Sequence, residues 1–210
     1  MYTPRVYRGE IFNSVTHLVG SVLAAAGLTA LVWIGVREGD PWKVGSFAVY
    51  GASLVALYLF STLYHCLKGR AKTFFRKLDH TSIYVLIAGT YTPFALNPLR
   101  GPTGYGLLAA IWALAAIGVL QEFLIKRRRR ALSVSLYIFM GWLALAVVVP
   151  LARALGLSGL ALLFCGGILY TVGVIFYILG EKMAHSHGIF HLFVLAGSVV
   201  HFLVVFFYVA

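Results

Sequence analysis

The sequence predicts an all-α membrane protein, a bundle of seven transmembrane helices with the N-terminus in the cytoplasm and the C-terminus outside. Its 210 residues are 61% hydrophobic and only 11% charged, whereas a soluble domain is roughly 25% charged and under half apolar. Seven apolar runs are each about as long as the 20 residues that cross a bilayer. Basic residues are concentrated in alternate loops, which sets the orientation.

The expected spans occupy nearly the whole chain, so residues 1–210 form a single membrane domain with short connections. In order, the spans cover residues 12–36, 44–67, 79–97, 103–125, 131–150, 158–180 and 187–209. The first span is expected to be retained, because it is too long for the apolar region of a signal peptide and lacks a convincing cleavage site. Pro93 and Pro98 are expected to kink or end the third span.

The distribution of lysine and arginine orients the bundle. Of the 17 basic residues, 13 lie in the N-terminal segment and in the second, fourth and sixth loops, and four lie in the opposite loops. Basic loops remain on the cytoplasmic side, so the N-terminus is inside. The same loops account for the net charge of +11. This distribution argues against a nucleic-acid partner and favours membrane lipids, and the KRRRR run (126–130) is expected to face anionic headgroups.

Polar residues of four predicted helices converge on one layer of the bundle, in the cytoplasmic half. Ionisable residues are costly within a membrane and usually mark functional sites. Residues spaced by three, four or seven positions share one face of a helix. The converging residues are Glu10, Asn13 and His17 in the first helix, Ser61 and His65 in the second, Asp79 in the third, and His187 and His191 in the seventh.

This convergence predicts a zinc site. Two histidines four residues apart hold one metal ion from a single helix face, and His65 would complete a set of three. Three protein ligands and a water are typical of catalytic zinc, which lowers the pKa of that water to about 7. Asp79 is placed to hold the water or to accept its proton. His201 lies about 15 Å further along its helix than His191, too far to share the ion.

Simpler interpretations stay open for several of these residues. A histidine at a helix end is often interfacial or hydrogen-bonded rather than a ligand. Glu10, Asn13 and His17 fit a helix cap or an anchor to a neighbouring helix as well as a chemical role. His80, about 100° around the helix from Asp79, is expected to be interfacial. The two cysteines, Cys66 and Cys165, form no metal motif and are expected to be reduced.

Together these motifs resemble those of the haemolysin III family, bacterial relatives of the progestin and adipoQ receptors. The matching stretches are EIFNSVTH (10–17), STLYH (61–65) followed by Asp79, KLDHTSIYVLIAGTYTPF (77–94) and HGIFH (187–191). The resemblance implies a seven-helix protein of the bacterial plasma membrane with zinc in its cytoplasmic half. It implies His65, His187 and His191 as zinc ligands, Asp79 as the residue that holds the water on the zinc, and Ser61 beside it.

The sequence leaves three hypotheses for the function. The first is a zinc-dependent intramembrane hydrolase of a lipid amide or ester, similar to a ceramidase and acting in membrane lipid homeostasis. The second is a non-enzymatic, receptor-like sensor in which zinc is structural. The third is a pore-forming cytolysin. No predicted helix has a polar stripe along its full length, which argues against a pore. Neither the substrate nor the oligomeric state follows from the sequence.

Overall fold

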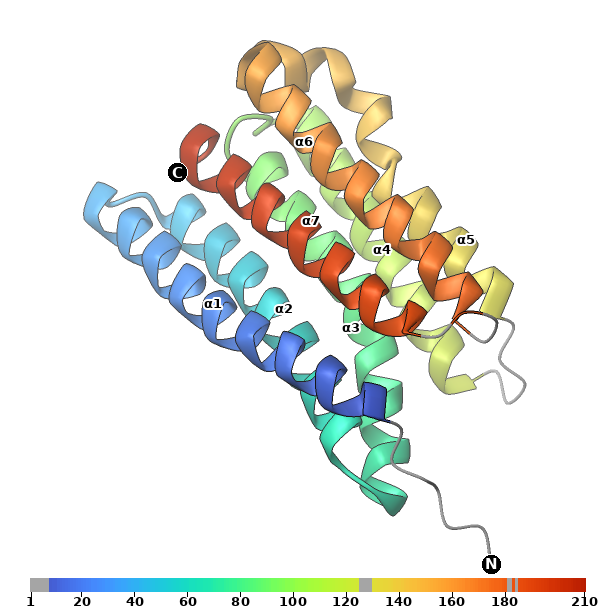
Figure 1. Ribbon diagram of the computed structural model, residues 1–210. Helices are drawn as coiled ribbons and strands as arrows, with labels where there is room; N and C mark the ends of the chain where they lie inside the picture. Colours follow the sequence, from blue (N-terminus) through green and yellow to red (C-terminus); the bar gives the residue numbers. More distant parts are fainter. Residues whose placement is uncertain (1–7, 125–129, 181–182, 184) are drawn as a thin grey trace, which may run out of the picture.

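The computed structural model describes residues 8–124, 130–180, 183 and 185–210, and this part of the chain folds into a helical bundle (Figure 1). Its helices, in chain order, are α1 (Arg8–Glu38), α2 (Pro41–Cys66), α3 (Gly69–Leu96), α4 (Pro102–Leu124), α5 (Arg130–Gly141), the 3-10 helix η1 (Leu143–Val147), α6 (Val148–Leu179) and α7 (Ser186–Tyr208).

The helices pack in chain order around a closed ring. Each α-helix contacts the next one along the chain, and α7 returns to contact α1 (Figure 1). Helix α3 also contacts α5 and α7, so it lies towards the inside of the ring. The first and last helices are therefore neighbours, although they are far apart in the sequence.

Helix α3 is more polar than its neighbours because much of its surface faces protein. Its buried serine and threonine hydroxyls donate to carbonyl oxygens about one turn earlier, for example Thr81 to Lys77 at 2.9 Å and Thr90 to Leu86 at 2.8 Å. Such bonds satisfy the hydroxyl within its own helix, so it can be buried at low cost. Within the described residues, five helical runs are long and apolar enough to cross a membrane, and α3 is not one of them.

Two of the predicted spans form one of these runs, over residues 130–179. Gly156, with φ 66° and ψ 174°, interrupts the helical geometry within α6, and glycine adopts this conformation without strain. In Figure 1 the chain ascends through α5 and η1, turns back and returns along α6. The fifth predicted span, over 131–150, is not one continuous helix, because α5 ends at Gly141 and a 3-10 turn precedes α6.

The third helix also differs from its prediction. It begins at Gly69 rather than at residue 79, directly after α2 ends at Cys66. Its first turns carry the basic residues that were assigned to a loop, and they project beyond the rest of the bundle (Figure 1). The apolar pattern locates only the part that crosses the bundle, because the exposed first turns carry no apolar stripe. As predicted, Pro93 lies within the helix and Pro98 follows its end.

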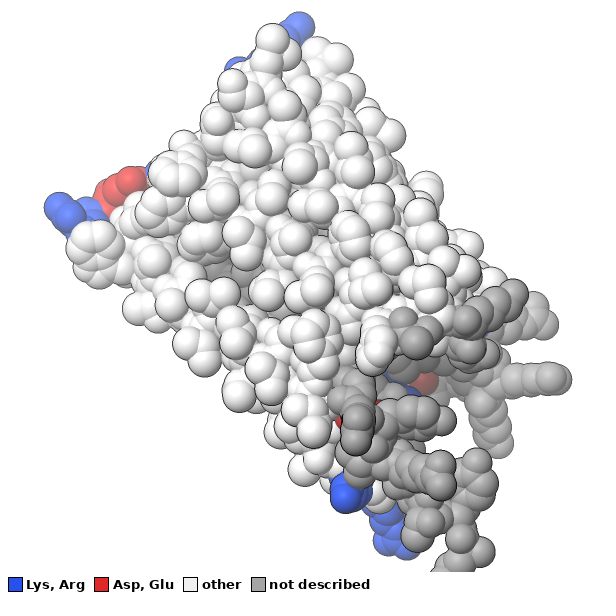
Figure 2. Space-filling model, in the orientation of Figure 1, with Lys and Arg blue, Asp and Glu red and all other residues white. Residues whose placement is uncertain are grey.

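The outer surface of the bundle is suited to lipid. On the face shown in Figure 2, charged side chains lie only towards the two ends, and the band between them is uncharged. Large apolar side chains such as Val22, Ile117, Leu157 and Phe207 are each more than half exposed. A contiguous apolar surface of this kind is uncommon on soluble monomers and marks contact with a membrane or a partner.

We predict that Gly51→Ala destabilises the bundle, whereas Gly45→Ala on the same helix does not. A Cβ at Gly51 would lie 2.6 Å from Leu28 Cδ1 and 2.9 Å from its Cα, and one at Gly45 would have no neighbour within 4 Å. Overpacking costs about 1–3 kcal/mol, more than the roughly 1 kcal/mol that alanine gains over glycine in a helix. Thermal unfolding in detergent should therefore show a lower midpoint for Gly51→Ala only. Equal midpoints for the two variants would contradict the tight α1–α2 contact.

Candidate metal centre

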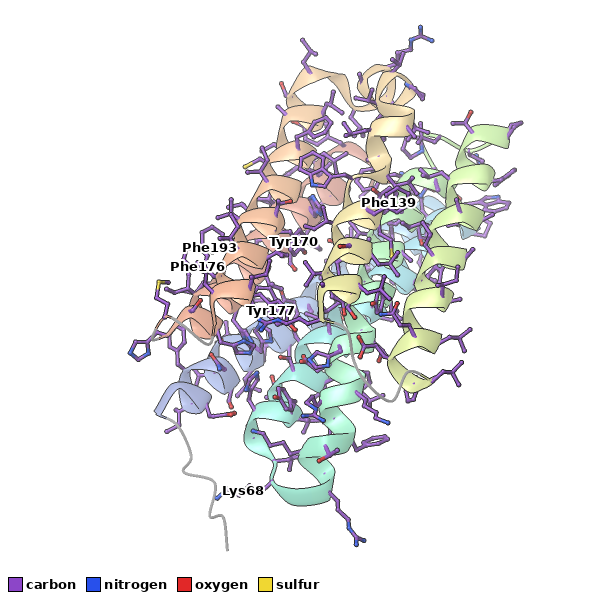
Figure 3. All side chains as sticks on the ribbon, turned by 90° about the vertical axis from the view of Figure 1, so that its right-hand side faces the viewer. Lys68, Phe139, Tyr170, Phe176, Tyr177 and Phe193 are labelled. Carbon is purple, nitrogen blue, oxygen red and sulfur yellow. The ribbon has the colours of Figure 1, made fainter. Side chains whose placement is uncertain are left out.

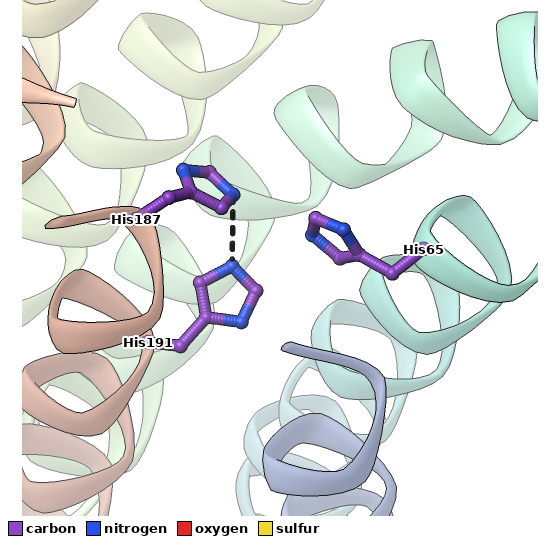
Figure 4. A group of neighbouring side chains, drawn as sticks. All are labelled: His65, His187 and His191. Atoms are coloured by element: carbon purple, nitrogen blue, oxygen red, sulfur yellow. Dashed lines mark hydrogen bonds between the residues drawn. The ribbon is translucent and has the colours of Figure 1, made fainter. Parts of the chain in front are cut away.

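Three histidines from two helices meet at one end of the bundle. His65 lies in the last turn of α2, and His187 and His191 lie in the first two turns of α7. Each offers one ring nitrogen, and the three nitrogens all lie within 4.8 Å of one another. Figure 4 shows the three rings turned towards a common point, with Nε2 of His187 and Nε2 of His191 3.1 Å apart.

The three side chains fit a transition-metal ion. Tetrahedral zinc with Zn–N bonds of 2.0–2.1 Å requires its nitrogen ligands to lie about 3.3 Å apart, close to the 3.1 Å between His187 and His191. Nε2 of His65 is buried and has no hydrogen-bond partner among the residues that the structure describes. A buried nitrogen usually has a partner, and a metal ion would supply one. Neutral imidazole suits zinc, copper, iron and nickel.

The glycine of HGIFH allows α1 to approach α7 closely. A Cβ at Gly188 would lie 2.7 Å from Phe12 Cδ1 and 3.2 Å from Asn13 Oδ1. This approach brings the His17 ring onto His191, with centroids 3.7 Å apart and an angle of 24° between the planes. Small residues at helix contacts in membranes generally allow two helix backbones to approach closely. The EIFNSVTH motif (10–17) therefore adjoins the candidate metal centre, because its His17 contacts His191 directly.

His17 is the fourth imidazole at this centre, although it lies outside the set of three that could hold an ion. Its side chain is buried, and neither ring nitrogen has a hydrogen-bond partner within the described ranges. The ring also lines the main cavity of the bundle. A neutral imidazole has one donor and one acceptor, so His17 is equipped to pair with a polar group in that cavity.

Glu10 connects α1 to α2 and α3 beside the candidate metal centre. Its Oε2 accepts a hydrogen bond of 2.9 Å from Nδ1 of His65, and both of its carboxylate oxygens accept from Nζ of Lys72 at 3.1 Å. The sequence placed Glu10 in the same layer as the histidines and left its partner open. The partner Lys72 lies in the first turn of α3, in the part that was predicted to be a loop.

The centre adjoins an interior cavity of about 150 Å³. His187 and His191 line it, and so do Ser61 from α2 and Asp79 from α3. His65 is not among its lining residues, so the cavity reaches the centre from the α7 side. The structure thus brings the two predicted catalytic residues and two of the three predicted ligands to the wall of one cavity.

Away from the metal centre, apolar and aromatic side chains dominate the cavity wall. Tyr170 and Tyr177, both labelled in Figure 3, contribute from α6. Further along, Trp142 and His201 line both this cavity and a smaller one of about 50 Å³. The cavity therefore extends along α7 from the metal centre as far as His201. Apolar walls with a few convergent polar groups are typical of small-molecule sites.

His80 was expected to be interfacial. It is half-buried and lines the cavity, and its ring centroid lies 6.5 Å from that of Tyr64. Because α3 is an inner helix, a side chain 100° around from Asp79 still faces protein. The many hydroxyl residues of α3 are the sequence signal that would have indicated this position.

A chain of three hydroxyls further along the cavity was also missed. Tyr58 donates to Ser198 Oγ at 2.7 Å, and the Tyr170 hydroxyl lies 2.7 Å from the same oxygen. No spacing rule connects residues on three different helices, so the sequence alone does not reveal this network. The prediction for His201 is confirmed: it is separate from the metal centre, and its Nε2 donates to the Leu163 carbonyl at 3.0 Å.

Comparison with known proteins identifies the family. The family model described as haemolysin-III related matches residues 6–202. The chain belongs to the haemolysin III family. Two bacterial relatives each match 95% of this chain. "Hemolysin-3" of Bacillus cereus is 47% identical, and the match covers 91% of its own length. "Hemolysin-3 homolog" of Bacillus subtilis (strain 168) is 44% identical, and the match covers 93% of its own length.

A plant relative connects this haemolysin III protein to the adiponectin-receptor group. "Heptahelical transmembrane protein ADIPOR2" of Oryza sativa subsp. japonica is 31% identical, over 81% of this chain and 84% of its own length. The resemblance seen in the motifs is therefore confirmed. With its apolar helices and these relatives, the chain is a multi-pass integral protein of the bacterial plasma membrane.

We predict that the purified protein binds one divalent transition-metal ion, and that His65→Ala, His187→Ala or His191→Ala each reduces its metal content to a small fraction of the wild-type value. Removing one of three protein ligands leaves too few for a stable site. Mass-spectrometric metal analysis of detergent-purified protein provides the measurement. His185→Asn is the control, because His185 is exposed at φ 63° and asparagine tolerates that conformation. Equal metal content in all variants would exclude the three-histidine site.

Proposed function

We propose that this haemolysin III protein is a zinc-dependent hydrolase that cleaves a lipid amide or ester within the membrane. The observation that carries the proposal is the meeting of three histidines, Asp79 and Ser61 beside one largely apolar cavity. Such a cavity suits a hydrophobic substrate, and these polar groups line or adjoin the end where chemistry would take place. This activity would serve membrane lipid homeostasis.

The number of ligands supports a catalytic role for the metal. The histidine cluster offers three nitrogens, and catalytic zinc sites keep a fourth position open, whereas structural sites are usually closed by four protein ligands. Zinc bound there would polarise a substrate carbonyl and acidify a water molecule. The sensor hypothesis, with structural zinc, has no comparable support from the ligand set. An open position beside a cavity is the arrangement that a hydrolase requires.

The remaining steps fall to residues of the chain. The Asp79 carboxylate would accept a proton from the attacking water and pass it to the departing amine or alcohol. Ser61, which is fully buried in the same wall, would donate a hydrogen bond that orients the substrate or the water. His17 offers a further donor near the carbonyl. The apolar wall would hold the acyl chain and exclude bulk water from the reacting groups.

We predict that Asp79→Asn keeps its zinc and loses hydrolysis by about 10²–10⁴-fold, the usual contribution of a general acid–base. Activity is measured in liposomes on a panel of fluorescent ceramides and acyl esters, with zinc content determined on the same preparations. Glu122→Gln is the matched control, because Glu122 is a half-buried carboxylate that bonds Ser133 at 2.9 Å and does not line the cavity.

The outcomes separate the three functional hypotheses. Zinc-loaded wild type that turns over no lipid amide or ester would overturn the hydrolase and leave the sensor. Single-channel conductance of the pure protein in planar bilayers would instead support a pore. Unchanged turnover by Asp79→Asn would remove Asp79 from the mechanism.

We also propose that the bundle crosses the membrane seven times with its N-terminus in the cytoplasm. The spans would be α1, α2, α3, α4, the run from α5 to Gly156, the rest of α6, and α7. The excess of basic residues on one side supports this orientation, and the name of the rice relative, "heptahelical", supports the number. Alkaline phosphatase fused after Ala210 should be active outside the cell, whereas a fluorescent protein fused there should fail to mature. The opposite pattern would contradict the topology.

A further inference from the structure

A carboxylate outside the three-histidine set contacts one of its members. Glu10, at the start of α1, is half-buried. Its Oε2 lies 2.9 Å from Nδ1 of His65, and Nζ of Lys72 lies 3.1 Å from both of its oxygens. Three helices thus meet at this one side chain.

The bond from His65 to Glu10 determines which nitrogen of His65 faces the metal centre. An ionised carboxylate only accepts hydrogen bonds, so Nδ1 of His65 must carry the hydrogen. Nε2 is then left with its lone pair, and this atom is buried without a partner in the described part of the chain. The His65 ring is also directed at the other histidines, with its centroid 5.3 Å from His187 and 5.0 Å from His191.

Lys72 holds this carboxylate in place. Because Nζ bonds both oxygens, the carboxylate cannot rotate away from His65 without breaking a charge-assisted contact. The ammonium group is itself held 4.9 Å above the ring of Tyr64, the residue next to His65. The projecting first turn of α3 supplies Lys72, which gives that extension a role at the metal centre.

We propose that Glu10 is a positioning residue for His65: through Nδ1 it fixes the ring and the tautomer so that Nε2 is presented to the metal, and Lys72 holds the carboxylate in that position. Outer carboxylates of this kind orient metal-binding histidines and raise their basicity, and their loss typically costs 10–100-fold in metal affinity. The proposal rests on the metal site proposed above and adds to it the residue that prepares one ligand.

The first test compares Glu10→Gln with Glu38→Gln. Glutamine keeps the size of the side chain, lacks the charge, and can present either its amide nitrogen or its oxygen to His65. The control removes a second glutamate of α1 that also pairs with a lysine, since Glu38 Oε2 lies 2.6 Å from Lys43 Nζ at the opposite end of the helix. Zinc affinity is measured by chelator competition in detergent, and cobalt substitution reports the coordination through its visible absorption.

We expect Glu10→Gln to bind zinc 10–100-fold more weakly and to shift the cobalt absorption, while Glu38→Gln matches the wild type. Thermal unfolding of both metal-free variants shows whether a loss of affinity is only a loss of folding. Wild-type zinc affinity in a folded Glu10→Gln protein would overturn the proposal.

The second test needs no metal, so it separates this proposal from the zinc site itself. Nitrogen-15 NMR of histidine-labelled, metal-free protein distinguishes the two imidazole tautomers, and a His65→Gln sample assigns the signal. Wild type should show the Nδ1–H form at His65, and Glu10→Gln should show a mixture. The Nε2–H form in wild type would overturn the proposal. The Nδ1–H form in a protein that binds no zinc would support the positioning and overturn the zinc site alone.

Discussion

The constraint that governs this protein is the cost of a polar group in a hydrocarbon environment. Within a bilayer each polar side chain must find its partner inside the protein, and at this end of the bundle several partners lie on other helices. Glu10 bonds His65 and Lys72, His17 stacks on His191, and the three candidate ligands face one another. These polar contacts link α1, α2, α3 and α7 at this end of the bundle.

The inner position of α3 follows from the same constraint. Its serine and threonine hydroxyls are satisfied within the helix, which allows it to be buried among the other helices instead of facing lipid. That position brings both Asp79 and His80 to the cavity wall, while its extended first turn brings Lys72 to Glu10. One helix therefore supplies the proposed general base and, through Lys72, supports the positioning of a metal ligand.

The arrangement of polar and apolar groups connects the proposed reaction to the membrane. The candidate metal centre and Asp79 lie at one end of the cavity, and the remainder is lined mainly by aliphatic and aromatic side chains, with a few polar ones such as His201 and Thr171. A lipid substrate would place its amide or ester at the polar end and its chain along the apolar part. The same separation explains why few charged residues are needed: a metal ion and one carboxylate would carry the chemistry, while apolar burial holds the substrate.

The sequence by itself determined the membrane class, the family and the residues that meet at the metal centre. It could do so because apolar length, i, i+4 spacing and the depth of each residue in its span are local properties of the chain. The prediction that His65 lies in the same layer as His187 and His191 followed from the depth of each residue in its span. The break at Gly156 was also foreseeable in outline, as the separation between two predicted spans.

Only the tertiary structure decided which helices are neighbours, and hence which polar groups are partners. The approach of α1 to α7 at Gly188, the contact of Lys72 with Glu10 and the inward direction of His80 all depend on packing between helices distant in sequence. Spacing along one helix specifies a face but not what that face meets. Those contacts are fixed by the shapes and polar partners of several helices together, which is why the role of Glu10 emerged only from the assembled bundle.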